Sequence, residues 1–308
     1  MSFFFKSRVL RYHFIFFVLI ATGASAQESI IISAPQSKEV EARLARAYSL
    51  LNSADTTAVS AFWPNVQPKY FFDNIRQNLG HPNAINQGRA TNFCGYAAFT
   101  HLLVRYRPDL YVESLLNLYR NNSTQLSKGL WQASPAVFQA AGTLRQKGEL
   151  DMHHADQLWF LALADHFKGY MNILDHHYDP GDENKIWAGT NFSKFNKMLR
   201  AFSNSKQEAK GSDFIRPMTG DKYHYLSEQL SEGVVLLFIN NKYLYPHKHS
   251  AFTIRAPTHF IVLYSIVKQG NLFQLQYWDY GYRTELMITE KGLKKLIFGI
   301  TSLQKAAA

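Results

Sequence analysis

Hydrophobic positions recur with a helical period through the first two-thirds of the chain. Within KEVEARLARAYSLL, residues 38–51, the side chains of Val40, Leu44, Tyr48 and Leu51 recur every three or four positions and predict one apolar face of an amphipathic helix. Further helices are expected at residues 94–107, from Pro108 onward, after Ser134-Pro135, and over roughly 154–174 and 193–202.

The pattern changes in the last third, where apolar runs and alternating segments predict β-strands. They cover residues 234–239, 259–267, 272–278 and 284–288, with a turn at 268–271 and a basic helix at 290–297. Helices followed by an antiparallel sheet are typical of the α+β class. We expect a helical part over 27–210 and a sheet part over 211–308, packed as one unit.

The N-terminus has the pattern of a secretory signal peptide. Three basic residues precede a short apolar run, residues 14–20, and the small-residue site Ala24-Ser25-Ala26 follows. An uncleaved anchor is the alternative, but the apolar run is short for a membrane span. We therefore expect residues 1–26 to be removed and residues 27–308 to be secreted or periplasmic, with no membrane span.

Composition narrows the class of protein. Hydrophobic residues make up 46% and charged residues 18% of the 308 residues, which excludes wholesale disorder. The net charge of +10 is spread too evenly along the chain to imply a nucleic-acid partner by itself. A single cysteine excludes an intrachain disulfide and a zinc site with several thiolate ligands.

The single cysteine, Cys94, is a candidate nucleophile. A loop precedes it and a helix follows, so the thiol is expected at a helix N-terminus, where the helix dipole favours the thiolate. Gly95 would leave room for a substrate or partner backbone, and Ala97 and Ala98 would let the helix pack tightly. The alternative is an inert cysteine that packs as a small hydrophobic residue.

A thiolate needs a base and an orienting group, and His259 and Asp279 are the candidates. His259 begins an apolar strand, and Asp279 ends the strand that returns from the turn near Gly270. With a loop of residues 268–270 the two side chains are opposite each other. With a loop of residues 269–270 they fall on different faces unless a bulge intervenes, and the sequence leaves the choice open.

Three short segments resemble the papain-like cysteine peptidases, and the compact bacterial members more than papain itself. They are NFCGYAAF around Cys94, THFIVL around His259 and YWDYG around Asp279, in the order of that superfamily. The resemblance implies a nucleophile on a central helix packed against a sheet, and a Cys-His-Asp triad that forms an acyl-enzyme. It does not extend to the long helical segment between Cys94 and His259, which could form a substrate-recognition layer.

The oxyanion-binding residue departs from the papain pattern. Members of the superfamily usually carry a glutamine six residues before the cysteine, whereas Gln87 lies seven residues before Cys94 and Asn92 lies two before it. Either side chain could donate a hydrogen bond to the oxyanion beside the Cys94 N–H. The sequence leaves the choice between them open.

Other clusters have simpler explanations. The pairs His153-His154 and His176-His177, the His247-x-His249 segment and the acidic stretch from Asp175 lack the spacing of a metal site, and we expect no metal or cofactor. The aromatic residues of the helix near 154–174 are expected to pack in the core. The lysines at 291, 294 and 295 are expected to be a solvated face.

The residues therefore favour an exported thiol hydrolase that cuts an amide bond. Its substrate would be a protein or peptidoglycan, through a peptide, isopeptide or cross-link amide. The same triad would also serve a deamidase or a transglutaminase-like acyltransferase. A binding module that keeps the fold without catalysis is the alternative from another class, and the oligomeric state stays open.

Overall fold

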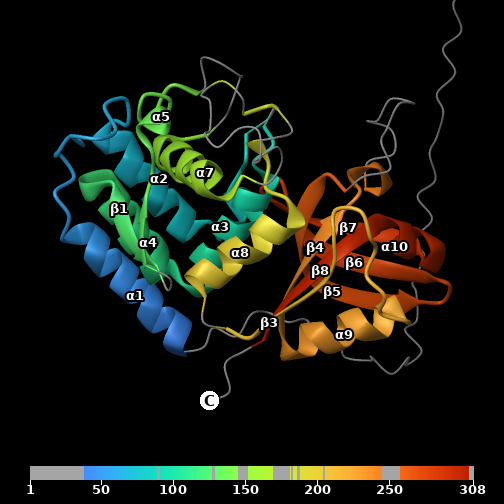
Figure 1. Ribbon diagram of the computed structural model, residues 1–308. Helices are drawn as coiled ribbons and strands as arrows, with labels where there is room; N and C mark the ends of the chain where they lie inside the picture. The colour runs from blue at the N-terminus through green and yellow to red at the C-terminus, as the bar shows by residue number, and fades with distance from the viewer. Residues whose placement is uncertain are drawn as a thin grey trace, which may run out of the picture. The chain divides into compact units, whose positions relative to one another are not determined.

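The structure is a computed structural model, and it describes residues 38–88, 91–126, 129–144, 152–168, 181, 183–185, 188–203, 205–244 and 257–304 (Figure 1). The expected leader, residues 1–26, lies outside the described residues. The end of the helix expected over 154–174 also lies outside them, because residues 169–180 are not described.

The first part of the described chain is mainly helical. Its elements are α1 (Lys38–Asn52), α2 (Pro68–Gly80), the 3-10 helix η1 (Pro82–Ala84), α3 (Cys94–Tyr106), α4 (Pro108–Asn121), the hairpin β1 (Ser123–Leu126) and β2 (Gly129–Gln132), α5 (Pro135–Phe138), α7 (His154–Phe167) and α8 (Phe192–Phe202). Almost every residue of α3 is buried, because this helix contacts α2, α4, α7, α8 and a strand of the main sheet. The expected central position of the Cys94 helix therefore matches the structure.

The second part is an antiparallel sheet with short helices between its strands. Its elements are β3 (Gln207–Gly211), α9 (Lys222–Glu232), β4 (Gly233–Ile239), η3 (Asn241–Tyr243), β5 (His259–Gln269), β6 (Leu272–Asp279), β7 (Tyr282–Thr289), α10 (Glu290–Leu296) and β8 (Ile297–Gln304). The strands are ordered β3-β8-β4-β5-β6-β7, and every pair is antiparallel. The mixed α+β class with an antiparallel sheet is confirmed.

The central strands are buried on both faces of the sheet, because successive side chains point to opposite sides and helices cover each side. One face packs against the helical part, where Phe260 of β5 stacks on Phe195 of α8 with ring centroids 4.2 Å apart. The other face packs against α9 and α10 and includes Ile261 and Leu263 of the same strand. The two parts of the chain therefore share one hydrophobic core.

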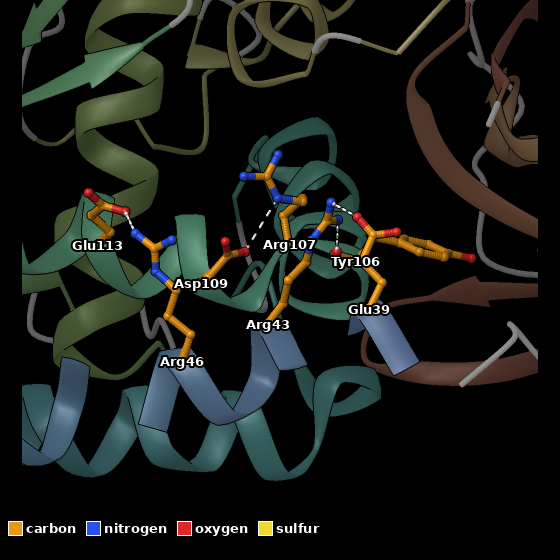
Figure 2. Close-up of polar contacts among 7 residues, drawn as sticks. All are labelled: Glu39, Arg43, Arg46, Tyr106, Arg107, Asp109 and Glu113. Carbon is orange, nitrogen blue, oxygen red and sulfur yellow. Dashed lines mark hydrogen bonds and ion pairs between the residues drawn. The ribbon is translucent and has the colours of Figure 1, made fainter. Parts of the chain in front are cut away.

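Polar contacts join α1 to the two helices that follow Cys94 (Figure 2). Arg43 donates from Nη1 to the carbonyl oxygen of Tyr106 at 2.9 Å, and so satisfies one of the carbonyls that α3 leaves open at its C-terminus. Arg46 reaches Glu113 of α4 at 3.6 Å. These contacts fix which side of α1 faces the protein.

The apolar face expected for α1 is partly wrong. Leu51 is buried as expected, but Tyr48 is exposed and Ala47 is buried instead. The buried side of α1 therefore runs through Ala47 and Leu51, and Arg43, one turn before Ala47, contacts the end of α3.

Several elements were not expected from the sequence. These are α2, the β1–β2 hairpin, α9 and the two neighbouring strands β3 and β8. The expected division near residue 210 falls inside β3, which joins the sheet by pairing with β8. A polar strand such as QEAKG has no apolar pattern to reveal it, and only its partner defines it.

Candidate active site

Cys94 is the first residue of α3, and its side chain is partly exposed. The residue before it, Phe93, makes no side-chain hydrogen bond to cap the helix. The N–H groups of the first turn therefore give this helix end a partial positive charge beside the sulfur atom, as expected from the sequence. The Sγ atom lies 3.8 Å from the carbonyl oxygen of Thr258, at the end of the segment that leads into β5.

Gly95, the residue after Cys94, lies where neighbouring parts of the protein leave no space for a side chain. A Cβ atom at Gly95 would lie 2.4 Å from Cγ2 of Thr190 and 3.1 Å from Cδ2 of Phe260. The expectation that Gly95 leaves space for a substrate or partner backbone is therefore wrong. Glycine is needed here because α3 packs directly against β5.

His259 is the first residue of β5, and its ring pairs with Asp279 close to Cys94. The Nε2 atom lies 2.5 Å from Oδ1 of Asp279, and the imidazole lines the same cavity as the thiol of Cys94. His259 is 2% exposed and Asp279 is 1% exposed. Burial alone would lower the pKa of His259, but the Asp279 carboxylate and then Cys94 outweigh it and raise the pKa to about 10. The imidazole is therefore protonated at neutral pH.

The hairpin that brings His259 to Asp279 has neither of the registers considered from the sequence. Its loop is Gly270-Asn271, with Gln269 paired to Leu272. Both expected registers, with loops of residues 268–270 or 269–270, are therefore wrong. Continued without interruption, the observed register would place the two side chains on opposite faces of the sheet.

A bulge in β5 corrects this mismatch. The pairing shifts by one residue between Leu263 and Ser265, so that Val262 lies opposite Trp278. Continued by one residue, this register places Asp279 opposite Ile261. Because Ile261 lies two positions after His259, Asp279 and His259 lie on the same face of the sheet. The ion pair therefore depends on the bulge, which leaves one residue of the strand, Tyr264, out of the ladder.

His101 fastens this bulge to the helix that carries Cys94. Burial lowers the pKa of His101 to about 3, so its ring is neutral. Its Nδ1 lies 2.9 Å from the carbonyl oxygen of Pro82, which can only accept, so Nδ1 carries the proton. Nε2 then accepts from the Tyr264 hydroxyl at 2.8 Å, and the ring stacks on Trp278 with centroids 4.7 Å apart.

The turn after Asp279 covers the imidazole. Tyr280 and Gly281 have φ of 47° and 84°, as in the two-residue turns that favour hairpins. Tyr280 stacks on His259 with ring centroids 4.5 Å apart, and its hydroxyl accepts a hydrogen bond from Asn241 Nδ2 at 3.3 Å. The sequence alone did not indicate this stacking, although a bulky residue before a turn glycine was a visible signal.

A cavity of about 240 Å³ opens beside the sulfur atom. It is lined by Gln87, Thr91, Asn92, Cys94, Asn240, Asn241, Lys242, Thr258, His259 and Tyr280. Both oxyanion candidates therefore reach the cavity. Gln87 Nε2 donates to the Thr91 carbonyl at 3.4 Å, whereas Asn92 Nδ2 donates to the Asn184 carbonyl at 2.8 Å.

The asparagines that follow β4 are site residues that the sequence analysis missed. Asn240 is buried at the strand end, and its Oδ1 accepts from the backbone N–H of Lys242 at 3.0 Å. Oδ1 of Asn241 is buried and has no hydrogen-bond partner among the described residues. The only signal in the sequence was a pair of amide residues directly after an apolar strand.

The remaining candidates do not assemble into a second site within the described part of the chain. No group of three or more potential metal ligands occurs among the described residues. His154 accepts from the Gln67 N–H at 3.0 Å, and the aromatic residues Trp159, Phe160 and Phe167 are buried in the core. The other histidine pairs and the acidic stretch, residues 175–180, 182, 247 and 249, lie outside the described residues.

Comparisons with protein-family models, with curated proteins and with solved structures found no match for this chain. None of the helices that the structure describes is long and apolar enough to cross a membrane.

Proposed function

We propose that the protein is a papain-like thiol hydrolase that cleaves an amide bond through Cys94, His259 and Asp279. The observation that carries the proposal is the buried ion pair between His259 and Asp279, at 2.5 Å, whose imidazole lines one cavity with the partly exposed thiol of Cys94. A buried histidine held by a carboxylate beside a thiol at a helix N-terminus is the arrangement that activates a cysteine nucleophile.

The residues support a two-step reaction. The Cys94 thiolate attacks the carbonyl carbon and forms a C–S bond, while the His259 imidazolium donates its proton to the leaving nitrogen as the C–N bond breaks. Water then attacks the thioester and gives a proton to the neutral imidazole. The C–S bond breaks, so the acid leaves and the Cys94 thiolate is restored. Asp279 holds the ring in place and stabilises its charge.

The lining of the cavity supports an amide substrate, because it is rich in amide side chains that can hydrogen-bond a peptide group. The N–H of Cys94 and the amide of Gln87 or Asn92, which line the same cavity, can donate to the oxyanion. Lys242 adds a positive charge to the lining, which favours a substrate with a carboxylate near the scissile bond.

Product profiling tests the proposal. Purified protein is incubated with a peptidoglycan digest and with a proteome-derived peptide mixture, and the products are compared by mass spectrometry with those of Cys94→Ala. We expect cleavage products that require Cys94, together with a thioester adduct on the wild-type protein. Identical profiles from both proteins in both mixtures would leave the binding module as the better explanation.

Hydrolysis and acyl transfer share the thioester and differ in what attacks it. The same experiment separates them, because hydrolysis adds one water to the acyl product and transfer adds an amine. We propose hydrolysis, and export to the cell exterior or periplasm by the expected leader. Amine adducts that exceed the water product when small amines are supplied would favour the acyltransferase instead.

A further inference from the structure

A loop on the sheet part presents large apolar side chains to solvent. It joins β3 to α9, and Phe214, Ile215 and Met218 within it are 87%, 63% and 90% exposed. Phe214 and Met218 are the most exposed large hydrophobic residues of the described chain. Several such side chains gathered in one short loop point to an interaction surface.

The loop is held in this conformation by the protein. The Ser212 hydroxyl accepts from the N–H groups of Phe214 and Ile215, at 3.2 and 2.8 Å. The buried Lys222 donates from Nζ to the carbonyl oxygen of Pro217 at 2.7 Å. These hydrogen bonds hold the backbone of the loop in one conformation, in which its large apolar side chains are exposed to solvent.

A basic hollow adjoins the loop. It contains five exposed basic residues and one acidic residue, namely Arg216, Lys268, Lys291, Lys294, Lys295 and Glu290. Arg216 lies between Ile215 and Pro217, and its guanidinium contacts the Lys295 carbonyl at 3.4 Å, so the loop and α10 meet here. Figure 1 shows the segment between β3 and α9 passing beside α10.

The positive charges are close enough to affect a buried neighbour. Burial, and then the charges of Lys294 and Arg216, lower the pKa of Lys222. The basic hollow adjoins the loop anchored by Lys222, because Arg216 reaches α10 from this loop, and we call the two together the basic-apolar face.

We propose that the basic-apolar face docks on an anionic lipid bilayer, with Phe214, Ile215 and Met218 inserted between the headgroups and the basic residues over them. The apolar side chains would contact the acyl chains of the lipids, and the lysines and arginines beside them would contact the anionic headgroups. A soluble polyanion would use the charges alone and would gain nothing from the three exposed apolar side chains, so the bilayer explains both features.

The basic-apolar face is separate from the proposed active site. The basic hollow and the cavity beside Cys94 have no lining residue in common. Lys268 lies nine residues along β5 from His259, which corresponds to about 30 Å of strand. A docked molecule would therefore keep the cavity open to the aqueous side, and changes on this face should not alter the reactivity of Cys94.

Vesicle binding tests the proposal. Every described element lies within residues 38–304, so protein without residues 1–26 keeps the whole described fold and avoids the apolar leader. Sedimentation with phosphatidylcholine vesicles containing phosphatidylglycerol measures the partition coefficient. We expect binding to these vesicles and much weaker binding to pure phosphatidylcholine. Equal partition into both, or no binding to either, would overturn the proposal.

Three variants locate the contact. The triple variant Phe214→Ser, Ile215→Ser and Met218→Ser should lose on the order of 100-fold in partition coefficient. Lys291→Gln, Lys294→Gln and Lys295→Gln together should also lose roughly 100-fold, at about five-fold for each charge. The control Val59→Ser with Leu130→Ser removes exposed apolar side chains elsewhere and should bind like wild type.

Two further readings complete the test. Iodoacetamide labelling of Cys94 at the wild-type rate shows that each variant is folded. If the apolar triple variant binds vesicles like wild type, and only the lysine variant loses binding to both vesicles and heparin, the surface is a polyanion site and the bilayer proposal is wrong.

Discussion

The ion pair between His259 and Asp279 predicts how the stability of this protein depends on pH. The pKa of His259 is raised to about 10 in the folded protein, against about 6.5 in an unfolded chain. A raised pKa contributes stability that is complete below pH 6.5 and is lost as the pH rises through 10. Between these values the folded protein holds one proton more than the unfolded chain.

The slope follows from that single proton. The contribution of His259 to the free energy of unfolding should fall by about 1.4 kcal/mol per pH unit, or about 3 kcal/mol between pH 7 and 9.5. The perturbation is Asp279→Asn, which removes the carboxylate that raises the pKa most. Burial then lowers the pKa of His259, and the slope disappears.

Urea unfolding followed by tryptophan fluorescence measures this at several pH values. Both proteins keep Cys94, because the thiol contributes to the raised pKa of His259, and the groups that the substitution does not affect cancel when the two curves are subtracted. The stability advantage of Asp279 should be largest at pH 7 and shrink by about 3 kcal/mol toward pH 9.5. A difference that stays constant over this range would refute the assignment of a protonated His259 held by Asp279.

The remaining predictions concern the geometry around this pair. Inserting one alanine between Val262 and Leu263 should shift the ladder by one residue, turn His259 away from Asp279 and lower turnover by at least about 100-fold, whereas an alanine inserted between Gly270 and Asn271 lengthens only the loop and serves as the control. Asp279→Asn should keep partial turnover and Asp279→Ala should lose more; near-wild-type rates in both would remove Asp279 from the triad. His259→Ala should slow iodoacetamide labelling of Cys94 at neutral pH, and an unchanged rate would mean that another residue is the base. Gly95→Ala should destabilise the protein by about 1–3 kcal/mol in urea, because its Cβ would overlap a neighbouring side chain, and full stability would contradict the tight packing of α3.

Local patterns determined where the candidate site residues lie along the chain. The change from loop to helix at Cys94, the start of an apolar strand at His259 and the end of the return strand at Asp279 were all predictable. They were predictable because a helix start and a strand of alternating or apolar residues are specified by neighbours within a few positions. The α+β class follows from the same periodicities.

Elements without such a local pattern were not predictable. The strand β3 is polar and exists by pairing with β8. Gly299 within β8 looks unfavourable for a strand, yet a Cβ there would lie 2.4 Å from the ring of Phe192. Which residue suits these positions depends on side chains that lie far away in sequence.

The contact between His259 and Asp279 shows most clearly what the tertiary structure decided. Sequence spacing gives the length of the hairpin to within a residue, but one residue moves a side chain to the other face of a sheet. The bulge at Tyr264 sets the final register, and His101 holds Tyr264 from a helix more than 150 residues earlier in the chain. The sequence therefore identified the candidate residues of the site, and long-range packing brought them together. Packing was decisive because the energy that favours one register over the next comes from contacts outside the hairpin.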